Sequence, residues 1–337
     1  MGCTETPPVP VQPHWTVQPV ETTARFQAVS AVDENTLWTS GTGGTYARTL
    51  DGGATWTAAV VPGADSLEFR DVHAVDALTA YLLSAGPGTA SRIYKTTDGG
   101  QTWTLQFTNA EPEGFFDCMD FWTPERGLAF SDAVNGRLLL ITTNDGGATW
   151  QPVPPENIPP ALEGEGAFAA SGTCLLAQSG GHAWIGTGAS GIEARVFHTA
   201  DYGRTWTVAT TPIASDSGTS GIFSLAFRDA LHGAALGGDF GKPDENRDNV
   251  AVTDDGGRTW TMVGATQLPG AVFGATYVPG APTPTLLAVG PTGSDISTDN
   301  GRTWARIDTL NYWAVTAVGS DAAWAVGPGG RVTRLTW

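Results

Sequence analysis

The 337-residue chain is poor in basic residues. Lys and Arg together number 17 against 34 Asp and Glu, which gives a formal net charge of -17. A nucleic-acid binder needs a basic stripe to neutralise phosphates, so no nucleic acid is expected as a partner. The same charge opposes binding to anionic membrane surfaces. No apolar run reaches the roughly 18 residues of a membrane-spanning helix, so no transmembrane segment is expected.

Cysteine is scarce, with three in the whole chain. Two internal thiols are too few for a disulfide framework, and neither a CxxC pair nor a Cys/His metal spacing occurs. We therefore expect Cys118 and Cys174 to be free and buried, with a bridge between them as the alternative. GxSxG, Rossmann and P-loop patterns are also missing, which leaves nucleophilic hydrolysis and nucleotide chemistry without a sequence basis. No cofactor is expected.

The N-terminal segment MGCTETPPVPVQP is polar and rich in proline, with Cys3 near its start. It resembles the start of a mature bacterial lipoprotein, in which a lipid-bearing Cys precedes a flexible linker. This resemblance predicts a flexible tether over residues 1–13, a possible lipid anchor at Cys3 and an exported, periplasmic or cell-surface location. An arbitrary N-terminal tail is the alternative.

One pattern, [ST]-x-D-x-G-x-T-W, recurs six times at intervals of 44 to 56 residues. It is typical of a hairpin turn: the Asp accepts backbone hydrogen bonds, and the Gly takes a positive φ. The Trp then begins the outgoing strand and packs its ring between neighbouring sheets. We expect these residues to be structural: Asp51, Asp98, Asp145, Asp201, Asp255, Asp299, Trp56, Trp103, Trp150, Trp206, Trp260 and Trp304.

Each repeat contains four short strands, which is one blade of a β-propeller. The segment HWTVQPV carries Trp15 without a preceding turn, whereas the chain ends after three strands of a further blade. The sequence therefore predicts an all-β, seven-bladed propeller whose ring is closed by residues 14–20 pairing with the C-terminal blade. We expect a single domain over 14–337, a monomer, with blades at about 21–63, 64–110, 111–155, 156–215, 216–267, 268–309 and 310–337 plus 14–20.

The six motifs resemble the Asp-boxes of BNR-repeat propellers, a superfamily that includes sialidases and the photosystem II assembly/stability factor group. The [FY]-R-I-P motif of sialidases is absent, the nearest string being SRIYKTT. The single-propeller layout is most similar to the assembly-factor group. That resemblance implies an exported, non-catalytic module that binds a protein partner. A glycoside hydrolase and a carbohydrate-binding lectin are the alternatives, since a fold does not fix a function.

In such propellers, the loops from outer to inner strands and from second to third strands share one face, which we call the loop face. Carboxylates crowd the expected loop face, and solvation of the rim is their simplest role. For a hydrolase, paired acids would come from Asp117, Glu163, Glu165 and Asp239. A calcium ion is a weaker option, with Asp239, Asp244 and Glu245 as candidate ligands.

Arginines recur near the loop-face ends of predicted strands, where guanidinium groups could bind an anionic ligand. The candidates are Arg92, Arg137, Arg195, Arg331 and Arg70, with local ion pairs as the alternative. A protein-binding face would instead present apolar anchors, for which the candidates are Phe115, Phe116, Phe168 and Phe240. The expected partner is a protein segment or a glycan on this face.

Overall fold

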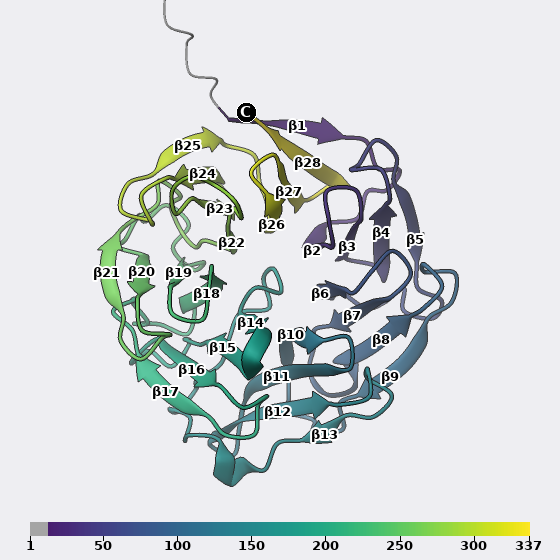
Figure 1. Ribbon diagram of the computed structural model, residues 1–337. Helices are drawn as coiled ribbons and strands as arrows, with labels where there is room; N and C mark the ends of the chain where they lie inside the picture. The colour runs from purple at the N-terminus through teal and green to yellow at the C-terminus, as the bar shows by residue number, and fades with distance from the viewer. Residues whose placement is uncertain (1–12) are drawn as a thin grey trace, which may run out of the picture.

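The computed structural model describes residues 13–337, which form seven four-stranded antiparallel sheets arranged as a ring (Figure 1). The predicted all-β, seven-bladed propeller is confirmed. Within residues 13–337, no helix is long and apolar enough to cross a membrane. Cys3, the predicted lipid-anchor position, and most of the predicted tether lie outside the described residues.

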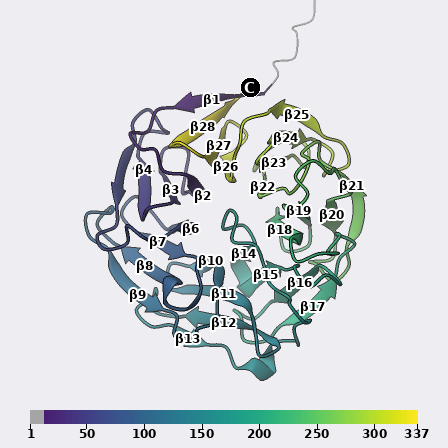
Figure 2. The ribbon, with the colours of Figure 1, turned by 180° about the vertical axis from the view of Figure 1, so that it is seen from behind.

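Each blade runs from an inner strand at the ring centre to an outer strand at the rim (Figures 1 and 2). Blades 1 to 4 comprise β2 (Phe26–Ala31), β3 (Leu37–Gly41), β4 (Thr45–Thr49), β5 (Thr57–Val60); β6 (Phe69–Ala74), β7 (Ala80–Ser84), β8 (Arg92–Thr96), β9 (Thr104–Thr108); β10 (Phe116–Thr123), β11 (Arg126–Val134), β12 (Arg137–Thr143), β13 (Gln151–Pro152); and β14 (Leu175–Gln178), β15 (His182–Gly186), β16 (Arg195–Thr199), β17 (Thr207–Thr210).

Blades 5 to 7 follow the same order. They comprise β18 (Ser220–Phe227), β19 (Gly233–Asp239), β20 (Val250–Thr253), β21 (Thr261–Gly264); β22 (Gly274–Tyr277), β23 (Leu286–Gly290), β24 (Gly293–Ser297), β25 (Ala305–Asp308); and β26 (Ala314–Gly319), β27 (Ala322–Gly327), β28 (Arg331–Thr336) with β1 (His14–Gln18). Short 3-10 turns η1 (Gly88–Ala90), η2 (Pro155–Asn157) and η3 (Ser179–Gly181) lie in connecting segments.

The ring closes through β1, which pairs antiparallel with β28 from His14↔Thr336 to Gln18↔Val332. In both ribbon views β1 lies along β28 at the rim (Figures 1 and 2). The predicted closure is confirmed. It pairs the two ends of the described chain in one sheet and gives the seventh blade the same four strands as the others.

The six repeated motifs form identical hairpin turns between the third and fourth strands, which we call the aspartate turns. In the first, Asp51 Oδ1 accepts hydrogen bonds from the Thr55 N–H at 2.8 Å and the Thr49 hydroxyl at 2.7 Å. Asp51 Oδ2 accepts the Thr55 hydroxyl at 2.6 Å, and Thr49 Oγ1 accepts the Gly53 N–H. Gly53 has a φ of 91°, which favours glycine. The face that carries these turns is the turn face.

The motif tryptophans pack between blades. Each ring belongs to the apolar cluster formed by its own blade and the preceding one; for example, Trp56 packs with Leu37 of blade 1 and Trp324 of blade 7. Trp15 does the same for blades 6 and 7, where its Nε1–H also donates to Ser294 Oγ at 2.8 Å. The core is therefore a ring of inter-blade clusters.

A disulfide joins Cys118 on β10 to Cys174, which directly precedes β14. Their Cα atoms are 6.1 Å apart and both side chains are buried. The prediction of free thiols was wrong. The bridge forms because the two residues occupy adjacent inner-strand positions of neighbouring blades, a proximity that local spacing rules for cysteine do not consider.

Candidate functional site

The inner strands of four blades carry a bulge at the same level near the loop face. The register shifts between Phe26 and Ala28, Phe69 and Asp71, Phe116 and Cys118, and Ile222 and Ser224. A bulge leaves one residue unpaired and re-aims its side chain. The residues at these bulges are Gln27, Arg70, Asp117 and Phe223. In blades 6 and 7, Phe273 and Trp313 directly precede the inner strands β22 and β26.

Blade 4 differs, because its inner strand β14 begins only at Leu175. The preceding residues 167–174, here called the plug segment, run toward the centre of the ring (Figures 1 and 2). The Ser171 hydroxyl donates to the Phe273 carbonyl of blade 6 at 2.6 Å, and the Thr173 and Ser224 hydroxyls are 2.7 Å apart. Cys174 fixes the end of the segment to blade 3. The plug segment therefore divides the central channel.

On the loop-face side lies a cavity of about 590 Å³, here called the mouth pocket. Aromatic rings form one wall. Phe168 stacks on Phe223 with centroids 3.9 Å apart, Phe223 lies 5.9 Å from Phe273, and Phe273 lies 5.0 Å from Trp313. Phe240 stands at the lip with half of its surface exposed, 6.0 Å from Phe168. Phe223 and Phe168 are buried and support the wall from behind, so Phe240, Phe273 and Trp313 provide the apolar surface that a ligand can reach.

The other wall of the mouth pocket is acidic. Asp117 is 1% exposed, and its Oδ2 has no hydrogen-bond partner among the described residues. The Asp132 carboxyl adjoins it and accepts the Ala167 N–H at 2.8 Å. Burial, together with the charge of Asp132, raises the pKa of Asp117 well above its usual range, and Arg70 offsets only part of this. Burial also raises the pKa of Asp132.

Arg70 lines the pocket beside these acids, but its charge is already engaged. Its Nε and Nη2 donate to Glu68 Oε2 at 3.1 and 2.8 Å. Arg25 also reaches Glu68, at 3.4 Å, and its Cζ lies 4.7 Å from the centre of the Trp313 ring. This chain of contacts links the polar wall to the end of the aromatic wall.

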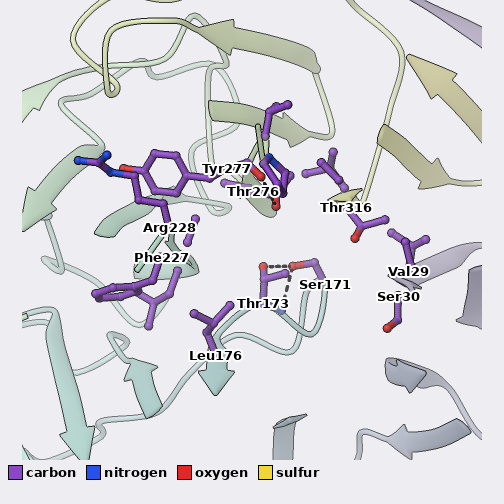
Figure 3. A pocket seen from close by; sticks show the side chains of 18 of the residues that line it. Val29, Ser30, Ser171, Thr173, Leu176, Phe227, Arg228, Thr276, Tyr277 and Thr316 are labelled. Atoms are coloured by element: carbon purple, nitrogen blue, oxygen red, sulfur yellow. Dashed lines mark hydrogen bonds between the residues drawn. The ribbon is translucent and has the colours of Figure 1, made fainter. Parts of the chain in front are cut away.

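On the turn-face side of the plug segment lies a second cavity of about 730 Å³, here called the lower cavity. Figure 3 shows Ser171 and Thr173 of the plug segment in this cavity, with Thr276 and Thr316 from blades 6 and 7 nearby. On another wall His73 Nδ1 lies 2.8 Å from Asp120 Oδ1. No residue predicted from sequence to bind or react lines this cavity.

Asp71 also borders the lower cavity. It is almost fully buried, and its Oδ2 accepts the Met119 N–H at 2.7 Å. Burial raises the pKa of Asp71 well above its usual range, and the nearby charge of Asp120 adds to the effect. Asp71 therefore keeps its proton to a higher pH than an ordinary carboxyl group does.

Of the four candidate hydrolase acids, the structure brings Asp117 and Glu165 to the mouth pocket. Glu163 is exposed on the loop before the plug segment. Glu165 forms a buried ion pair with Arg195, whose Nε lies 2.9 Å from Glu165 Oε1 and whose Nη2 contacts Oε2. Asp239 is buried and accepts the Thr219 hydroxyl at 2.6 Å and the Gly241 N–H at 2.9 Å. Glu165 and Asp239 therefore hold loops in place.

The candidate ligand arginines do not converge. Only Arg70 lines the mouth pocket. Arg92, Arg137 and Arg331 begin third strands and donate to carbonyls of nearby loops: Thr89, Pro155 and Asn311, respectively. With Arg195 bound to Glu165, these side chains bond to groups close to their own blades.

No group of three or more His, Cys, Asp or Glu within residues 13–337 is arranged to hold a metal ion. Of the weak calcium candidates, Asp239 is bonded as above, and Glu245 contacts Lys242 at 3.7 Å and Arg247 at 3.4 Å. Asp244 lies in the exposed loop beside them.

Among the apolar candidates, Phe115, Phe168 and Phe240 line the mouth pocket, and Phe116 is buried against Phe107. Sequence reasoning did not identify Phe223, Phe273 and Trp313, or Asp132 as the neighbour of Asp117. A signal existed for the three aromatic residues: each directly precedes the residue at which continuous pairing with the second strand begins, namely Ser224, Gly274 and Ala314.

No family model matches the chain, and no curated protein matches it in sequence. Solved structures with a similar fold include YCF48 bound to D1 peptide, at 18% identity and a TM-score of 0.63, covering 96% of this chain and 97% of that one. YCF48 from Cyanidioschyzon merolae is 15% identical with a TM-score of 0.62, and the match covers 95% of this chain and 98% of that one. The WD40 propeller domain of Doa1 is 13% identical with a TM-score of 0.60, and the match covers 95% of each chain. These identities show the fold alone.

Proposed function

We propose that the chain is a non-catalytic, exported protein-binding propeller that takes a partner segment on its loop face, as the assembly factors that its repeats resemble are expected to do. The observation that carries the proposal is the aromatic wall of the mouth pocket, with Phe240 exposed at its lip. Clustered aromatic anchors in a concave site are typical of energetically dominant protein contacts. YCF48 bound to D1 peptide supports it, since a propeller of similar shape binds a peptide.

The acids of the pocket support binding over hydrolysis. Glycosidases place two carboxyl groups about 5 to 9.5 Å apart on either side of the bond to be cleaved. Asp117 and Asp132 instead adjoin each other on the neighbouring strands β10 and β11, and Glu165 forms an ion pair with Arg195. Two carboxyl groups that adjoin each other are not placed on either side of a substrate bond, as a glycosidase requires.

The disulfide supports export. Bridges persist in secreted and periplasmic proteins and are rare where thiol reductants are abundant. The buried Cys118–Cys174 pair fits an oxidising compartment. It does not bear on the lipid anchor predicted at Cys3.

The test is a selection of random phage-displayed peptides on the immobilised protein, followed by affinity measurements on the enriched peptides. Phe240→Asp removes an anchor from the mouth pocket. Leu50→Asp is the matched control, because Leu50 is equally exposed but lies in an aspartate turn on the opposite face. We expect Phe240→Asp to weaken binding about tenfold or more and Leu50→Asp to change it less than about twofold.

Two results would contradict the proposal. One is the enrichment of no peptide, or of peptides that bind Phe240→Asp as well as the wild type. The other is turnover of a glycoside panel that Asp117→Asn abolishes, which would establish the hydrolase instead.

A further inference from the structure

We infer that the mouth pocket recognises a basic side chain: a Lys or Arg of the partner segment lays its alkyl stem along the aromatic wall and brings its cation to Asp117. This rests on the proposed function, because it names the chemistry that the partner presents to the same site. Three independent features of the pocket lead to it.

The first feature is the unsatisfied acid. Asp117 Oδ2 is buried, lines the pocket and lacks a donor among the described residues. A buried acceptor without a partner is destabilising, and each such group calls for an explanation. An N–H donor from a ligand would satisfy it. An incoming cation does so best, since hydrogen bonds between charged groups are the strong ones.

The second feature is the wall opposite the acid. Phe168, Phe223, Phe273 and Trp313 form one unbroken aromatic arc. Aromatic faces attract cations, and the long stems of Lys and Arg cover apolar surface while their charged ends reach a polar group. The site already contains an example, since the guanidinium of Arg25 lies over Trp313.

The third feature is the balance of charge. Five carboxyl groups surround the pocket against three guanidinium groups: Asp117, Asp132, Glu113, Glu165 and Glu68 against Arg70, Arg25 and Arg195. Arg70 and Arg25 share Glu68, and Arg195 is bound to Glu165. Within residues 13–337, no basic side chain forms an ion pair with Asp117, Asp132 or Glu113. The net charge of -17 also steers basic segments toward the molecule.

Recognition of a cation by this acid releases a proton. The charged groups nearest Asp117 are Asp132 from β11 and Arg70 from β6, and Arg70 is paired with Glu68. The other charged groups around the pocket are Glu113 and the Glu165–Arg195 pair beside the plug segment. Because burial raises its pKa, Asp117 keeps its proton to a higher pH than an ordinary carboxyl group. A bound cation favours the ionised form, so affinity for a basic segment rises with pH.

The experiment uses the full chain and enriched peptides from the selection above. For each peptide, the anchoring position is made Lys, norleucine or Glu, and affinity is measured between about pH 5 and pH 8. We expect Lys to bind about tenfold or more tightly than norleucine, with an advantage that grows as pH rises. Asp117→Asn should remove most of the advantage. Glu34→Gln, which changes net charge equally on an exposed turn-face loop, should retain it.

The outcomes separate the two proposals. Equal binding of Lys and norleucine peptides by the wild type, a preference for Glu, or enrichment of peptides without any basic residue would overturn the inference while leaving a peptide-binding site. Failure of every peptide to depend on Phe240 would overturn the proposed function itself. The comparison of peptides on the wild type needs no variant, so a poorly folding Asp117→Asn would not prevent a decision.

Discussion

Removing the Cys118–Cys174 bridge should cost the protein a large part of its stability. The two cysteines are separated by 56 residues, so the bridge closes a loop of that size in the unfolded chain. The chain-entropy model assigns such a loop about 4 kcal/mol at 25 °C. Native domains are stable by only about 5 to 15 kcal/mol. For a chain of this length, the loss corresponds to a fall in Tm of about 6 °C.

The assay is denaturant unfolding of the oxidised wild type and of the Cys118→Ala/Cys174→Ala double variant. Adding reductant after unfolding should bring the refolded wild type close to the double variant and leave the double variant unchanged. Thiol labelling of the unfolded, non-reduced chain should find one reactive cysteine, Cys3, of the three. Three reactive thiols, or equal unfolding midpoints for the two proteins, would refute the bridge and the argument built on it.

Further predictions concern closure and pH. Trp15→Ala should lower the free energy of unfolding by about 2 to 4 kcal/mol, because the Trp15 ring packs between blades 6 and 7. Val17 is exposed on the same strand, so Val17→Ala should change the free energy of unfolding little. Burial raises the pKa of Asp71, so its contribution to stability is full below about pH 4 and is lost as pH rises through the folded-state pKa. The Asp71→Asn variant should therefore become more stable relative to wild type as pH rises. Urea unfolding midpoints of the two proteins at several pH values measure this difference. The Thr102 hydroxyl is the largest of the contacts that lower the pKa of Asp98 to about 2. Thr102→Val should unfold more easily than wild type at neutral pH, and the difference should shrink as pH falls toward 2; a constant difference would contradict this origin.

Much of the fold could be predicted because its signal is local. Each aspartate turn satisfies its own hydrogen bonds within eight residues, and each motif Trp marks the start of an outer strand. The position of Trp15 then indicates the missing strand of the seventh blade. These short-range patterns and their spacing are enough to predict how the chain divides into blades.

The site was harder to predict because it depends on contacts between blades. The side chains of Arg70, Asp117 and Phe223 face the pocket through bulges, which alternating patterns do not reveal. The plug segment replaces the start of an inner strand, and nothing local in AFAASGTC indicates that it crosses the channel.

The disulfide had a readable signal. The separation of 56 residues between the bridged cysteines equals that between Trp150 and Trp206, which places the cysteines at equivalent positions of adjacent blades. Local cysteine spacing was the wrong comparison, because in a propeller the spacing that brings residues together is the repeat itself.

The central claim is that a partner segment binds in the mouth pocket. The most direct measurement is hydrogen–deuterium exchange of the protein with and without a selected peptide. Binding as proposed should slow exchange in residues 113–117, in residues 164–170, which include the first half of the plug segment, and in residues 238–241 around Phe240. Slowed exchange confined to the aspartate turns, or to the outer strands at the rim, would contradict it.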